Sequence, residues 1–153
     1  MSDLPSIALG AVLAIAGGAA GDEFRSWRER SHEREAIKIG LSDELEEIAT
    51  TLKSMHDVWT QAKVLSQSYV SNLISNTTTF DALRTRLFLI KDEKLRKRIV
   101  AFYKRMTDTA KKYEGKLGTL ATDTAALAEQ ADIEKEFQAV ATEADGIKKE
   151  LGK

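Results

Sequence analysis

Cysteine is absent from this 153-residue sequence, which excludes disulfides, thiolate metal sites and cysteine nucleophiles. Proline occurs once, as Pro5, so no later residue forces a helix to stop. The formal net charge is only −1, so the chain as a whole offers no electrostatic attraction for nucleic acid. With 31% charged and 42% apolar residues, the composition fits one modest domain that is helical almost throughout.

Side chains suited to catalysis or metal binding are scarce. Histidine occurs only as His32 and His56, which are not at helical spacing, and both are expected on the solvated surface. No HExxH motif and no glycine-rich phosphate loop occurs. A run of acidic residues is expected on the solvent side of a helix, near its N-terminus: Asp43, Glu44, Glu46 and Glu47. The sequence therefore predicts no enzyme activity, no cofactor, no metal and no small-molecule substrate.

One basic cluster lies between residues 91 and 105, with Phe102 and Tyr103 among its cations. Its members are Lys91, Lys94, Arg96, Lys97, Arg98, Lys104 and Arg105. Such a cluster can contact nucleic acid or anionic lipid heads. The spacing is more typical of the solvated side of an amphipathic helix whose Phe102 lies in the core. Nucleic acid is therefore not expected as a partner.

Residues 4–21 carry no charged side chain. As a helix rising about 1.5 Å per residue they span roughly 27 Å, close to the ~30 Å hydrocarbon core of a bilayer. We therefore expect residues 1–21 to form an N-terminal membrane-anchoring helix. Three alternatives stay open: a cleaved signal peptide, although no basic residue precedes the run, a buried helix of the bundle, and a flexible glycine-rich arm.

The flanks of this segment predict its orientation. Arg25 and Arg28 follow the apolar run and no Lys or Arg precedes it, which places the C-terminal side in the cytoplasm and the short N-terminus outside. Phe24 and Trp27 stand where interfacial aromatic residues anchor a helix end. The sequence thus predicts a single-pass membrane protein whose C-terminal domain is cytoplasmic.

Small residues recur along the predicted anchor. Gly10, Ala14 and Gly18 follow one another every four residues, and Gly17 with Gly21 forms a GxxxG motif. This spacing lets two membrane helices approach closely, so it predicts self-association or docking onto another membrane protein. A segment this rich in Gly and Ala also produces such spacings by chance.

Residues 22–40 read as a charged juxtamembrane stem, and residues 41–153 as the helical domain. Its first apolar stripe runs from Leu41 to Leu73 in alternating steps of four and three, the coiled-coil period, with Ser66 as its polar interruption. The residues expected to make helix–helix contacts in this stripe are Leu41, Leu45, Ile48, Leu52, Met55 and Trp59.

Residues 76–79 break this pattern. A short helix bearing Phe80 is expected next, capped by Thr78 or Thr79, and Asp92 is expected to open the helix after it. The contact stripe of that helix comprises Leu95, Ile99, Phe102 and Met106. A last stripe runs from Ile133 to Leu151.

The predicted fold class is all-α, with one N-terminal transmembrane helix followed by a heptad-patterned bundle of three to four helices. Whether the stripes pack within one chain or between copies stays open. This layout resembles that of many small signal-anchored helical proteins, an analogy that implies no activity.

Three functions fit the sequence. The first is a membrane scaffold, accessory subunit or tether that acts through helix–helix association. The second is a homo-oligomeric membrane-perturbing or pore-forming effector. The third is a soluble coiled-coil adaptor with a buried N-terminal helix. The expected partners are membrane lipid and other protein subunits or a second copy of the chain.

Overall fold

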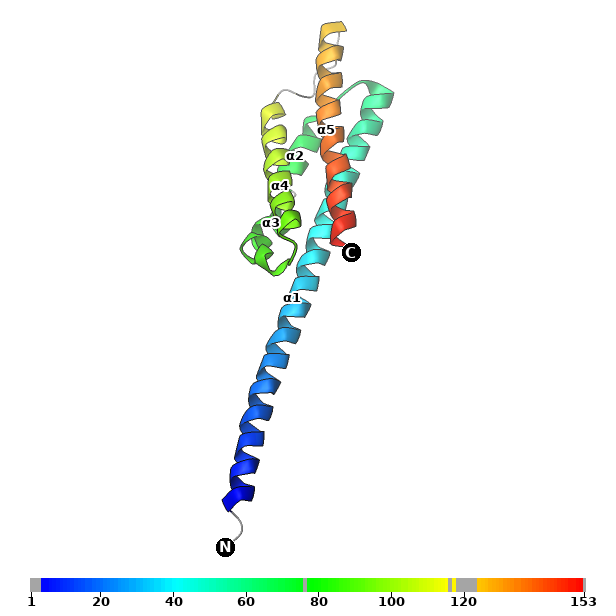
Figure 1. The fold of residues 1–153 in the computed structure, drawn as a ribbon. Helices are drawn as coiled ribbons and strands as arrows, with labels where there is room; N and C mark the ends of the chain where they lie inside the picture. The colour runs from blue at the N-terminus through cyan, green and yellow to red at the C-terminus, as the bar shows by residue number, and fades with distance from the viewer. Residues whose placement is uncertain (1–3, 76, 116, 118–123, 153) are drawn as a thin grey trace. The chain divides into compact units, whose positions relative to one another are not determined.

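The computed structural model describes residues 4–75, 77–115, 117 and 124–152, with side chains from Arg25 onward except that of Thr124. The elements follow one another as α1 (Leu4–Ala62), α2 (Gln67–Ser75), α3 (Thr78–Leu83), the 3-10 helix η1 (Arg84–Leu89), α4 (Glu93–Tyr113) and α5 (Thr124–Leu151) (Figure 1). No strand occurs in these ranges. The all-α helical bundle predicted from the sequence is confirmed.

The chain divides into two units, residues 1–36 and residues 37–153. The described residues of the first unit, 4–36, belong to α1. Among the described residues, no helix is long and apolar enough to cross a membrane. The side chains of residues 4–21, where the sequence predicts the membrane span, lie outside the described ones.

The second unit has one hydrophobic core, to which every one of its helical elements contributes. The apolar stripes of the C-terminal half of α1, of α4 and of α5 meet in this core within a single chain. From the first stripe the buried residues are Leu41, Leu45, Ile48, Leu52, Met55 and Trp59; from α4, Leu95, Ile99, Phe102 and Met106; from α5, Ile133, Phe137, Val140, Ala144, Ile147 and Leu151. Isolated helices are marginally stable in water, so this mutual burial is what holds them.

The heptad spacing predicts that the first stripe continues to Leu73, but in the structure it does not lie in one helix. Helix α1 ends at Ala62, and Lys63 takes a left-handed conformation with φ of +54° while its N–H donates to the Trp59 carbonyl at 2.9 Å. Residues 63–66 then redirect the chain, so that Leu65 enters the core in place of Ser66. A left-handed non-glycine residue leaves no signal in the apolar spacing.

Helix α4 begins where the sequence predicts. Asp92 Oδ1 accepts hydrogen bonds from the N–H groups of Lys94 at 2.8 Å and Leu95 at 3.1 Å, which confirms the predicted cap. After Tyr113, Gly115 adopts φ of +77°, a conformation that glycine takes without a Cβ penalty at helix C-termini.

Candidate functional site

The residues proposed for membrane packing lie largely outside the described side chains. This applies to Gly10, Ala14, Gly17, Gly18 and Gly21, and to the interfacial Phe24. Of the remaining interfacial residues, Trp27 is 62% exposed and Arg28 is exposed. Arg25 pairs with Glu29 at 3.2 Å on the helix surface.

The sequence predicts Glu44 on the solvent side of its helix, but in the structure Glu44 is buried. Its carboxylate accepts hydrogen bonds from the backbone N–H groups of Thr79 at 2.7 Å and Phe80 at 3.2 Å. Neither Thr78 nor Thr79 caps α3, and Thr77, which precedes it, makes no side-chain capping bond. Glu44 therefore satisfies the free N–H groups at the start of α3 from a different helix.

The other acidic residues of this run are exposed, as predicted. They are Asp43, Glu46 and Glu47. Glu46 pairs with Lys148 of α5 at 2.9 Å, and the hydrogen bond from this ammonium lowers the pKa of Glu46 below its ordinary value. The run thus joins α1 to both α3 and α5.

Tyr103 lies beside this cap. Its ring stacks on Phe80 with centroids 4.0 Å apart and an angle of 8° between the planes. Its hydroxyl oxygen is buried and makes no hydrogen bond of normal geometry. Burial, and then the neighbouring Glu44 carboxylate, raise the pKa of Tyr103 well above its ordinary value. The hydroxyl is consequently a neutral, buried group.

His56 is exposed, as predicted for a surface histidine, but it also contacts an acidic residue of another helix. Its Nδ1 atom lies 2.6 Å from Oε1 of Glu134, a carboxylate of α5 that is only 8% exposed. His32 is exposed. Within the described ranges, no group of three or more His, Asp or Glu side chains is placed to hold a metal ion. The contact of His56 with Glu134 joins α1 to α5 instead.

One column of basic residues on α4, two of them from the basic cluster, pairs with α5. Arg98 pairs with Glu150, Arg105 with Glu143, and Lys112 with Glu136 at 2.9 Å. The three cations are seven residues apart along α4, and their partners step backward by seven along α5. The two helices are therefore antiparallel and in heptad register along this seam. The hydrogen bond from Lys112 lowers the pKa of Glu136.

A second column of α4 is shifted by one residue and points to a different side of the helix. It consists of Lys97, Lys104 and Lys111, which are all exposed. Lys97 pairs with Glu93 of its own helix at 2.6 Å, whereas Lys104 and Lys111 form no ion pair with any described residue. This column has no counterpart to the acidic residues of α5.

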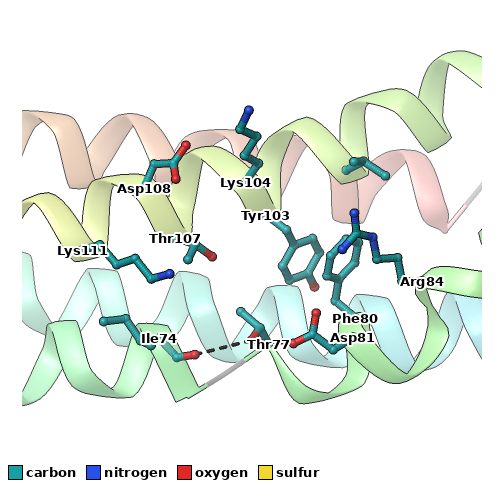
Figure 2. Close-up of a pocket in the computed structure, with 11 residues that line it drawn as sticks. Ile74, Thr77, Phe80, Asp81, Arg84, Tyr103, Lys104, Thr107, Asp108 and Lys111 are labelled. Atoms are coloured by element: carbon teal, nitrogen blue, oxygen red, sulfur yellow. Dashed lines mark hydrogen bonds between the residues drawn. The ribbon is translucent and has the colours of Figure 1, made fainter.

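The second column borders a surface groove, which we call the α4 groove. It consists of two adjoining hollows of about 420 and about 530 Å³ that share Arg84, Val100 and Lys104. The first is lined also by Ile74, Thr77, Phe80, Asp81, Tyr103, Thr107, Asp108 and Lys111, the second by Leu87, Phe88, Arg96, Lys97 and Ala101. Figure 2 shows the first hollow, with the rings of Tyr103 and Phe80 side by side.

The α4 groove combines apolar and cationic side chains. Val100 is 39% exposed and Phe88 is 69% exposed, so the groove presents large apolar side chains to solvent. The lining holds five cations and two carboxylates, a formal charge of +3 on a chain whose net charge is −1. Sequence reasoning assigned Lys97 and Lys104 to the basic cluster but missed Arg84 and Lys111. The seven-residue spacing of the lysines was the available signal.

Comparison with models of known protein families, with curated proteins and with solved structures found no match to this chain.

Proposed function

We propose that this chain is a non-enzymatic, single-pass membrane protein that acts as a tether, scaffold or accessory subunit. The observation that carries the proposal is the uncharged run of residues 4–21, which lies within the same helix, α1, that supplies a buried stripe to the bundle. Residues 22–40, the predicted stem, belong to this same helix. The basic residues that follow the run favour a cytoplasmic bundle.

The structure of the bundle supports a binding role. Its apolar stripes are buried against one another in a single chain, so they are not available to a partner. The α4 groove offers the cations and exposed apolar side chains that recognition uses, and its described lining includes no histidine and no serine. Asp81 and Asp108 lie in it without a base–nucleophile arrangement. Binding is therefore the activity that this surface supports best.

The anchor would contribute to assembly through its small residues. Gly17 and Gly18 belong to overlapping four-residue spacings of Gly and Ala, which allow close packing of membrane helices. Replacing both with leucine should retain insertion and weaken assembly. Crosslinking in native membranes measures this, and an unchanged pattern of crosslinked products would argue against the packing face.

Membrane retention through an alkaline wash tests the anchor itself. We expect the full-length chain to remain in the membrane pellet, and a Leu9→Arg, Leu13→Arg double variant to be released, since each arginine costs about 3 kcal/mol near the centre of a membrane helix. The matched control is Val58→Arg, a change of the same kind at an exposed position of the bundle. Release of the unaltered chain, or retention of the double variant, would contradict the proposal.

A further inference from the structure

Helix α4 already binds one acidic helix within the chain. Along the seam with α5, Arg98, Arg105 and Lys112 meet carboxylates spaced by seven residues. In this seam, a basic column at heptad spacing on α4 faces an acidic column at heptad spacing on the helix packed against it.

The column of Lys97, Lys104 and Lys111 repeats the basic half of this arrangement one residue earlier. Helix α2 also packs against α4. It carries no acidic residue, since its sequence is QSYVSNLIS. Lys104 and Lys111 have no ion-pair partner on α2 or on any other described residue. The α4 groove thus presents the basic half of this arrangement, and no acidic column among the described residues faces it.

The apolar residues of the α4 groove fit the same kind of occupant. Val100 lies between Lys97 and Lys104, and Thr107 lies between Lys104 and Lys111, at steps of three and four residues. In the second hollow, Leu87, Phe88 and Ala101 add apolar surface, and no carboxylate lines that hollow. An amphipathic helix binds such a surface by packing its apolar stripe against the apolar side chains. Its acidic residues then pair with the cations of the groove.

From these observations we infer that the α4 groove is the docking site for an acidic amphipathic helix of a partner protein, with carboxylates spaced by seven residues. The distance from Lys97 to Lys111 along α4 is about 21 Å, so the bound segment is about four helical turns long. A flat bilayer surface fits less well, because Val100 and Ala101 line a hollow. This inference specifies the partner-binding part of the proposed function, and it does not depend on the orientation of the anchor.

The two carboxylates in the lining do not cancel this attraction. Asp81 Oδ2 accepts a hydrogen bond from Thr77 Oγ1 at 3.3 Å, at the edge formed by α3. Asp108 stands between Lys104 and Lys111 on α4 and forms no ion pair with a described residue. Because both carboxylates line only the first hollow, the acidic residues of the partner are expected to concentrate near Arg84, Lys97 and Lys104.

Binding of a designed peptide to the full-length chain in mild detergent micelles tests the inference. The probe is a helical peptide of about four turns with glutamates every seven residues beside a leucine stripe, and its control carries glutamine at those positions. We expect saturable binding of the glutamate peptide, weakened by salt, and at least about tenfold weaker binding of the glutamine peptide.

Charge reversal locates the site. Lys104→Glu with Lys111→Glu should weaken binding of the glutamate peptide by at least about tenfold, whereas Lys149→Glu, an exposed position on α5, should leave it within about twofold. Circular dichroism checks that each variant folds. Val100→Gln, which keeps the charges, should also weaken binding.

Three results would overturn the inference. The glutamate and glutamine peptides could bind equally, or the charge reversal could leave binding unchanged. In the third case, the glutamate peptide does not bind, but short-chain phosphatidylserine below its micelle concentration does, and its binding depends on Lys104 and Lys111. The groove would then be a lipid-binding site. None of these results bears on membrane retention, so a failure here is distinct from a failure of the anchor.

Discussion

The carboxylate of Glu44 in α1 accepts a hydrogen bond from the backbone N–H of Thr79 at 2.7 Å, although the two residues are 35 positions apart in sequence. Helix α3 has six residues and is too short to be stable by itself. Glu44 holds its first turn, and with it Phe80, which lines the α4 groove. A buried acid in one helix thus helps to shape a surface formed by other helices.

Replacing Glu44 with alanine should destabilise the bundle. The N–H groups of Thr79 and Phe80 would lose their acceptor in a part-buried setting, at a cost of about 2–3 kcal/mol in the free energy of unfolding. Glu44→Gln keeps one acceptor oxygen and should cost about half as much. Urea unfolding of the full-length chain in micelles measures both. Equal stability of Glu44→Ala and the unaltered chain would contradict the capping role.

Replacing Tyr103 with phenylalanine should change stability little at pH 8, because the hydroxyl is buried without a hydrogen-bond partner. The effect should appear in alkali. The pKa of Tyr103 is raised in the folded chain, so above the unfolded value of 10.0 the unfolded chain loses this proton and the folded chain keeps it. Stability therefore falls as pH rises through about 10, by about 1.4 kcal/mol per pH unit for this one group.

The comparison of two pH values isolates this effect. Urea unfolding at pH 8 and at pH 11 should show the unaltered chain losing more stability than Tyr103→Phe. Lysines titrate in both proteins alike, so their contribution cancels in the difference. An identical loss in the two proteins would show that Tyr103 ionises as readily when folded as when unfolded.

Two helical glycines should respond differently to alanine. At Gly146 an added Cβ meets only the guanidinium of Arg98, with Nη2 at 2.9 Å and Cζ at 3.9 Å, and the end of this flexible side chain can move aside. Gly146→Ala should therefore gain about 0.5–1 kcal/mol from helix propensity. At Gly40 the Cβ meets Cγ2 of Thr79 at 3.2 Å, in the residue that Glu44 holds in place. Gly40→Ala should bring no gain or a loss, as thermal unfolding measures.

The contact between His56 and Glu134 should be a coupled pair. His56→Ala leaves the buried carboxylate of Glu134 without its hydrogen bond and should cost about 2 kcal/mol. Removing Glu134 as well, with Glu134→Ala, removes that unpaired group. A double-mutant cycle should give a coupling of at least about 1 kcal/mol. Strictly additive changes would mean that the two side chains act independently.

Apolar spacing predicts the core of this fold well, since Leu45, Leu52 and Ile99 lie in the buried stripes where the heptad pattern places them. The capping role of Asp92 is equally predictable, because a helix cap is a local feature of the sequence. The turn at Lys63 is not, since a lysine rarely adopts the left-handed conformation found there.

The polar contacts were the least predictable part. Glu44 and His56 look solvated when only their own helix is considered, and each is paired with a residue from a distant segment. The α4 groove depends in the same way on which side of α4 receives α5. The basic residues were visible in sequence, but the distinction between the paired Arg105 and the unpaired Lys104 requires the tertiary structure.

Cysteine labelling tests the central claim, an anchored chain with its bundle in the cytoplasm, most directly. The chain has no cysteine, so Ser2→Cys and Ser54→Cys each introduce a single thiol, the second at an exposed position of the bundle. In intact cells a membrane-impermeant maleimide should label Ser2→Cys alone, and Ser54→Cys should react only after permeabilisation. Labelling of Ser54→Cys in intact cells, or recovery of either variant outside the membrane fraction, would contradict the account.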